Sequence, residues 1–190
     1  MIGKFCVLVI VFLFLINMFG CSSAKNTIKK NDNVTLTKNY YNSESSHLLI
    51  KIPSGWNKIK DNSEKLFDFW IVSPQKKSSI VFIPITIENK LNNKEDVINF
   101  LNESNKKIKR SSKDNFVLLE EIKLQKVNNL FVKGFIYKEG ANIKRTIVLG
   151  NGKRFYESLA YFNKNYNPTN DEVKNLFKLQ NLVLSTVEIK

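Results

Sequence analysis

The stretch VLLEEIKLQKVNNLFVKGFIYKEGANIKRTIVLGNGKRFYESLAYF, residues 117–162, decides the fold. Its four runs are rich in β-branched and aromatic residues and predict four strands. The runs are Val117–Val127, Leu130–Lys138, Ile143–Leu149 and Arg154–Phe162. Two or four residues separate one run from the next, and every joint contains Asn or Gly. Because such short joints connect antiparallel neighbours, the stretch predicts an antiparallel meander.

The chain before the meander predicts further strands. Residues 47–52 form an apolar run that ends at Pro53-Ser54-Gly55, where Pro removes a backbone donor and Gly allows positive φ. Phe67–Ser73 and Ser79–Ile87 predict a hairpin. Pro84 interrupts the second of these strands, so we expect it at a sheet edge or a bulge, where its missing N–H costs nothing.

Two stretches change to the helical period. In residues 93–111, apolar residues recur every three to four positions, Asn93 can cap the first turn, and cations crowd the last turns. The second stretch begins with a capping box between Thr169 and Glu172. The order of strands, helix, four strands and helix predicts an α+β fold, with an antiparallel sheet of about six to seven strands covered by helices.

The first 20 residues predict a signal peptide. Lys4 precedes an apolar run, Phe5–Ile16, whose twelve residues make about 18 Å of helix. This is short of the roughly 30 Å that a membrane span needs, so a cleaved leader is favoured over a retained anchor. The junction Met18-Phe19-Gly20-Cys21 resembles the lipobox of bacterial lipoproteins. That resemblance implies that Cys21 is acylated and becomes the new N-terminus. The alternative is an uncleaved anchor with an incidental cysteine.

Residues 21–39 are polar and predict a flexible tether after the acylated cysteine. Residues 40–190 then form one domain, since the chain is long enough for one ordinary core and too short for two. With Cys6 in the leader and Cys21 acylated, the domain has no disulfide and no cysteine-based metal site.

The formal net charge is +13, or +12 once Lys4 leaves with the leader. Such a balance favours contact with anionic lipid head groups, envelope polymers or nucleic acid, of which nucleic acid is the least expected here; the alternative is solvated lysine that keeps the domain soluble. The densest cluster is Lys106, Lys107, Lys109, Arg110 and Lys113. These residues either grip an anion or form a solvated helix end that the helix dipole stabilises.

The sequence does not predict an enzyme. His47 is the only histidine and has no cysteine partner, so neither a triad nor a zinc site can be assembled around it. Glu120 and Glu121 are adjacent and would point to opposite sides of a strand, and Glu157 is an isolated carboxylate between aromatic residues. We therefore expect no catalytic residue, no metal and no cofactor.

The layout resembles the PsbP-like family. The resemblance rests on Ile50-Lys51-Ile52-Pro53-Ser54-Gly55-Trp56, on the meander through Asn151–Tyr156, and on the final helix ending near Ser185. It covers residues 40–186 and implies an α/β/α sandwich that acts in binding or assembly.

The expected function is that of a non-enzymatic binding or assembly domain. The lipid anchor would hold it on the extracytoplasmic face of a bacterial cell membrane, or at the outer membrane if the host is diderm, because Ser22 and not Asp follows the cysteine. An envelope protein is the expected partner. The alternative is a basic domain that binds an anionic envelope polymer, lipid head groups or nucleic acid.

Overall fold

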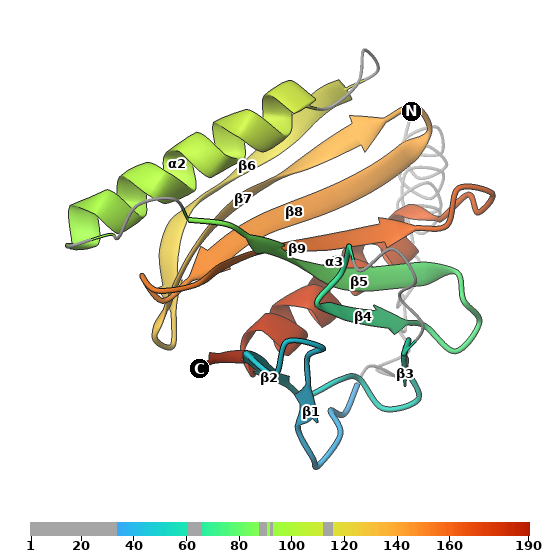
Figure 1. The fold of residues 1–190 in the computed structure, drawn as a ribbon. Helices are drawn as coiled ribbons and strands as arrows, with labels where there is room; N and C mark the ends of the chain where they lie inside the picture. Colours follow the sequence, from blue (N-terminus) through green and yellow to red (C-terminus); the bar gives the residue numbers. More distant parts are fainter. Residues whose placement is uncertain (1–33, 61–65, 88–90, 92, 112–115) are drawn as a thin grey trace, which may run out of the picture. The chain divides into compact units, whose positions relative to one another are not determined.

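The computed structural model describes residues 34–60, 66–87, 91, 93–111 and 116–190, which belong to one compact unit, Val34–Lys190. Within these residues a seven-stranded sheet, a three-stranded sheet and two helices form an α+β fold, as the sequence predicts (Figure 1). The predicted signal peptide, Cys21 and residues 22–33 of the predicted tether lie outside the described residues, as does Lys113.

The predicted meander is confirmed. Its strands are β6 (Phe116–Val127), β7 (Leu130–Glu139), β8 (Asn142–Gly150) and β9 (Phe155–Phe162), each antiparallel to the next. One residue in each joint has a positive φ: Asn128 at 52°, Gly140 at 60° and Gly152 at 88°. Asn and Gly are the residues that tolerate this conformation best, so the joints close where the sequence places them.

The first hairpin adds to the meander at β9. It consists of β4 (Phe69–Val72) and β5 (Ser78–Ile85), and the sheet order is β3-β4-β5-β9-β8-β7-β6, with β3 at Asn57–Lys58. Strand β5 lies between β4 and β9, but its pairing with β4 stops at Phe82, so Pro84 pairs only with Tyr156 of β9 and occupies a local edge of the sheet, as predicted.

The backbone geometry shows why proline is tolerated at this position. The pairing of β4 with β5 stops at Phe69, which lies opposite Phe82. The carbonyl of Phe82 accepts a hydrogen bond from Asp68 N at 2.8 Å. Alternate residues of a strand direct their backbone groups to the same side. Pro84 therefore turns its nitrogen to the side where β4 has ended, and no ladder hydrogen bond is lost.

A small sheet closes one end of the unit. It has the order β1-β2-β10, from strands Tyr41–Asn42, Leu48–Ile50 and Glu188–Ile189. The middle strand is the one predicted at 47–52, whereas the terminal strand β10 was not predicted. Leu36 forms an isolated antiparallel bridge with Pro53, so the last residues of the predicted tether contact the folded unit.

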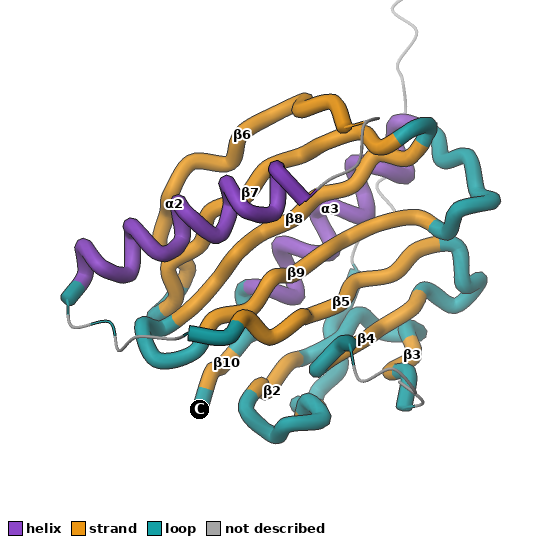
Figure 2. The backbone as a smooth tube through the Cα atoms, turned by 45° about the horizontal axis from the view of Figure 1, so that its top comes forward, coloured by secondary structure: helices purple, strands orange, loops and turns teal. Residues whose placement is uncertain are grey.

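The two helices pack on opposite faces of the large sheet (Figures 1 and 2). They are α2 (Lys94–Ser111) and α3 (Asn170–Leu184). Strand β8 shows the division, since Ile147 and Leu149 join the core beside α3 while Val148 joins the cluster beneath α2. Side chains of a strand alternate between its faces, so one strand supplies both cores.

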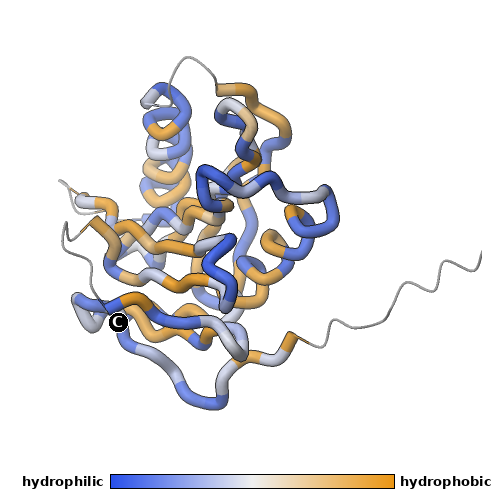
Figure 3. The backbone as a smooth tube through the Cα atoms, turned by 90° about the vertical axis from the view of Figure 1, so that its right-hand side faces the viewer, coloured by the Kyte–Doolittle hydropathy of each residue, from blue (hydrophilic) through white to orange (hydrophobic). Residues whose placement is uncertain are grey.

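Both predicted helix starts are confirmed. Asn93 Oδ1 accepts from Asp96 N at 2.9 Å, and Asp96 Oδ2 accepts from Asn93 N at 3.3 Å. The box between Thr169 and Glu172 is likewise reciprocal. In Figure 3 hydrophobic positions interleave with hydrophilic ones along helices and strands, as amphipathic elements require.

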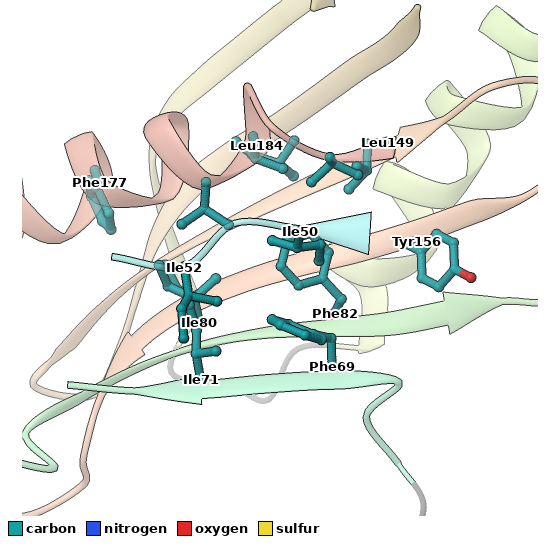
Figure 4. Close-up of a cluster of buried hydrophobic side chains, with 14 of the residues drawn as sticks. Ile50, Ile52, Phe69, Ile71, Ile80, Phe82, Leu149, Tyr156, Phe177 and Leu184 are labelled. Atoms are coloured by element: carbon teal, nitrogen blue, oxygen red, sulfur yellow. The ribbon is translucent and has the colours of Figure 1, made fainter. Parts of the chain in front are cut away.

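The main core lies between the large sheet, α3 and the small sheet. Figure 4 shows Ile50 at the end of β2, and Ile52 just after it, in one cluster with Phe82 and Ile80 of β5 and Leu184 of α3. Trp56 is half-buried and packs against this core.

One cation is buried in the same layer. Arg145 is 5% exposed; its Nε donates to Gln180 Oε1 at 2.7 Å and its side chain also donates to Asn181 Oδ1 at 2.5 Å. Burial lowers the pKa of Arg145 to about 10. The guanidinium lies 5.0 Å from the ring centre of Phe177, so it joins β8 to α3 through neutral partners.

Candidate anion-binding groove

The position of α2 on the sheet follows from its apolar stripe. Val97, Leu101 and Asn105 are buried, and they recur at the spacing of one helix face. Val97 and Leu101 pack with Val148 and Phe155 of the sheet. This fixes the rotation of the helix and decides which of its other side chains turn toward the end of β5.

A groove of about 530 Å³ opens between α2 and the chain that leaves β5. Its apolar wall consists of Ile85, Ile87, Leu91 and Phe100. The ring centre of Phe100 lies 4.4 Å from that of Phe155, so contact with the sheet holds the Phe100 side chain in place. The groove is within the size range of sites that bind small organic molecules.

The polar side of the groove is cationic. Lys106, Lys107 and Arg110 line it together with Glu103, Ser104 and Thr86. Three cations and one carboxylate leave this lining with a net charge of +2. Lys106 pairs with Glu103 at 2.7 Å, whereas neither Lys107 nor Arg110 has an ion-pair partner within the described part of the chain.

The cations of the groove lower the pKa of Glu103. The hydrogen bond from Lys106 is the main cause that lowers the pKa of Glu103, and the charges of Lys106 and Arg110 add to it. The positive charge of Lys107 and Arg110 is therefore the part of the lining that is left for an anion.

The structure places the residues of the predicted basic cluster on two sides of α2. Lys109 projects to the other side of α2, where it pairs with Glu121 and lies 5.2 Å from the ring centre of Phe135. Two residues along a helix are about 200° apart, which is why Lys107 and Lys109 face different ways.

A smaller cleft of about 230 Å³ lies on that other side of α2. It is lined by Asn102, Asn105, Lys106, Lys109, Glu121, Lys133 and Gly134. Asn105 is buried and donates to the carbonyl of Leu101 at 2.9 Å, and its Oδ1 finds no partner among the described residues. Lys133 Nζ donates to Asn102 Oδ1 at 2.6 Å. The cleft, like the groove, is lined by three cations and one carboxylate, but each of its cations already contacts a polar side chain: Lys106 contacts Glu103, Lys109 contacts Glu121 and Lys133 contacts Asn102.

The carboxylates named from the sequence do not form a pair. Glu121 faces α2 through Lys109, while Glu120 acts electrostatically on Arg145 on the opposite face, as adjacent strand residues must. Glu157 accepts from Thr146 Oγ1 at 2.6 Å, and burial raises the pKa of Glu157. It is a lone carboxylate beneath the α2 side of the sheet.

His47 lies at the start of β2. Its backbone donates to Ser45 Oγ at 3.3 Å, and its carbonyl accepts from Lys190 N at 3.0 Å. The described ranges contain no group of three metal-ligating side chains. No helix within them is both long and apolar enough to span a bilayer.

Sequence reasoning missed the apolar wall of the groove. Ile85 and Ile87 were read as the end of a strand, and Phe100 was not singled out. The alternation of Ile85 with Ile87 beyond Pro84 was the available signal, since it continues an apolar face past the point where the sheet needs it.

No protein-family model and no curated protein matches the chain. Among solved structures it is similar to LpqN, described as involved in cell envelope biogenesis of Mycobacterium tuberculosis, with 16% identity and a TM-score of 0.46 over 85% of this chain and 87% of LpqN. It is also similar to a Bacteroides thetaiotaomicron protein, with 13% identity and a TM-score of 0.43 over 80% of this chain. The chain spans about half of that protein's length, 48%. Both TM-scores are below 0.5, so neither similarity identifies a family.

Proposed function

We propose that this chain is a non-enzymatic, lipid-anchored binding protein of the bacterial cell envelope. The groove beside α2 is the proposed site, and its ligand is an anionic amphiphile, a molecule with an acidic head group and an apolar chain. The carrying observation is the lining of the groove, which combines an apolar wall with two cations, Lys107 and Arg110, that form no ion pair with any described residue.

The apolar wall is the part that favours an amphiphile over a simple anion. Ile85, Ile87 and Leu91 are only half-buried, so they expose apolar surface into the groove. Covering such surface contributes about 0.8 kcal/mol for each ligand CH₂ that leaves water. A bare inorganic anion would gain nothing from this wall.

The cations supply the polar half of recognition. Arg110 offers a planar donor array suited to phosphate or carboxylate, and Lys107 adds a mobile point charge. Both side chains are exposed, so their attraction for an anion is screened by salt. The groove thus favours a ligand whose head group lies at the rim and whose chain lies along the wall.

The location is proposed from the sequence. Acylation of Cys21 would hold the protein at a membrane, and a ligand with an apolar chain is enriched there. An extracytoplasmic face and an acidic lipid or lipid-linked polymer agree with the net charge of the chain. An envelope protein partner stays a separate prediction, to be sought by capture from envelope extract at low and high salt.

The test uses the chain from residue 22 onward and monododecyl phosphate below its micelle concentration, with inorganic phosphate and dodecanol as the two half-ligands. Calorimetry should show binding of monododecyl phosphate that is at least about tenfold tighter than that of either half.

Two variants and a matched control locate the site. Lys107→Glu with Arg110→Glu should lower the affinity about tenfold or more, since it places two like charges at the head group. Phe100→Ser should weaken the chain contact. Lys178→Glu, an exposed lysine on α3, should leave binding unchanged. Equal affinity of the double variant and the unchanged chain would reject the groove as the site.

A further inference from the structure

Strand β6 forms the long free edge of the large sheet. It has 12 residues, and none of the strands within the described residues pairs with its outer side. The opposite edge is β3, which has only 2 residues. A long edge presents a row of unpaired backbone groups that another strand can bind.

The start of this edge is apolar and exposed. Val117, Leu118 and Leu119 are 54%, 41% and 50% exposed. Because neighbouring residues of a strand point to opposite faces, the three side chains place apolar surface on both sides of the edge. Exposed apolar surface on an unpaired edge indicates a contact with another chain.

The charge pattern of β6 is complementary to that of a second copy of the strand running in the opposite direction. Glu120 and Glu121 precede Ile122, and Lys123 and Lys126 follow it. If two copies pair antiparallel about a two-fold axis at Ile122, Glu121 of each copy faces Lys123 of the other. Opposite charges directly across two strands stabilise the pairing, and the symmetry provides the contact twice.

The pairing of β6 with its own neighbour β7 changes along the strand. The pairing of β6 with β7 is irregular between Leu118 and Glu120 and again between Ile122 and Gln125, and it is regular from Glu120 to Ile122. In the proposed register Glu120–Ile122 of one copy faces Ile122–Leu124 of the other, so each regular stretch pairs with the second irregular stretch, which contains Lys123. Glu121 uses Oε1 for Lys109 of its own chain, so its second carboxylate oxygen is left to accept from Lys123 of the other copy.

We propose that the protein forms a two-fold homodimer in which two β6 strands pair antiparallel at Ile122, so that one sheet continues through both copies. The occupant of the free edge is therefore a second copy of this chain. This inference is independent of the ligand of the groove, because β6 does not line it.

Cysteine cross-linking of the full chain in membranes tests the register. Directly opposed residues of an antiparallel pair have Cα atoms about 4.5–5.5 Å apart, within disulfide range. Ile122→Cys should give a covalent dimer on mild oxidation. Val117→Cys is the matched control: in this register the two copies of residue 117 are roughly 33 Å apart, and no dimer should form.

A charge swap tests whether the contact between Glu121 and Lys123 stabilises the dimer. In the Ile122→Cys background, Lys123→Glu should reduce the dimer yield roughly fivefold or more, and adding Glu121→Lys should restore it. Lys178→Glu on α3 should have no effect. The proposal is overturned if Ile122→Cys stays monomeric, if Val117→Cys cross-links as well as Ile122→Cys, or if the charge swap fails to restore the dimer.

Discussion

At the scale of single residues, a buried arginine and a half-buried glutamate show how the sheet accommodates charge on each face. Arg145 meets neutral amide oxygens beside α3, and Glu157 meets one hydroxyl on the α2 side. The aromatic neighbours of Glu157 in the sequence accord with its half-buried position, but the amides around Arg145 come from a helix 35 residues away. A local sequence pattern can indicate burial, whereas hydrogen-bond partners so distant in the chain are determined only by the assembled fold.

Glu157 gives the first prediction at this scale. Burial raises its pKa above the ordinary value of 4.5, so the folded state binds the proton more tightly than the unfolded state does. The folded state is then stabilised at acid pH, and this stabilisation is lost as pH rises through the raised pKa. Glu157→Gln keeps an acceptor for Thr146 and removes the charge, so it should stabilise the protein at neutral pH.

Denaturant unfolding at several pH values measures this effect. The advantage of the Gln variant should shrink as pH falls toward 4.5. Glu172→Gln is the control of opposite sign, because the hydrogen bond from Tyr166 and other hydrogen bonds lower the pKa of Glu172. That variant should lose stability near neutral pH and recover parity in acid. A pH-independent effect of Glu157→Gln would contradict the assignment.

At the scale of elements, the strands of the meander and both helices could be predicted because their signals are local. The turn residues between β6 and β9, and the two capping boxes, lie within a few positions of the elements that they limit. The pairing of β5 with β9 and the strand β10 could not be predicted, since their partners are distant in the chain and their own residues do not encode the choice.

The candidate site could likewise be predicted from the sequence only in part. The helical period of 93–111 suffices to separate Lys109 from Lys107, because residues two apart point in nearly opposite directions. It cannot reveal that Ile85, Ile87 and Leu91 form the facing wall. That arrangement depends on where the chain leaving β5 runs against α2.

The start of α2 gives the prediction at this scale. Asn93→Ala removes the side-chain acceptor for Asp96 N and should destabilise the protein by about 1 kcal/mol. Asn99→Ala is the control, since Asn99 is exposed within the same helix, where Ala is the better helix former. Denaturant midpoints should fall for the first variant and stay level or rise for the second. Equal midpoints for Asn93→Ala and the unchanged chain would show that the cap contributes nothing.

At the scale of the whole molecule, the proposed anchor would couple attachment to binding. Attachment of every copy to one surface would raise the local concentration of the protein toward ligand and second copy alike. A single acyl chain gives marginal membrane binding and two make it stable, so a diacylated cysteine would suffice without a membrane-spanning segment. Ligand binding at the groove and pairing at the β6 edge would then occur at the membrane even where each contact is too weak to persist in free solution.

The two cysteines of the chain allow a direct test of the anchor. Cys21→Ala should block lipid attachment and leader cleavage, so the protein should keep the mass of the precursor. Cys6→Ala changes a residue of the predicted leader and should leave the anchored, cleaved product unchanged. Intact mass and detergent-phase partitioning of the two variants and the unchanged chain measure this. If Cys21→Ala still yields a membrane-bound product of mature size, the anchor is not at Cys21. The proposed enrichment of ligand and dimer at a membrane would then lack its cause, while the groove and the β6 edge would stand on their own tests.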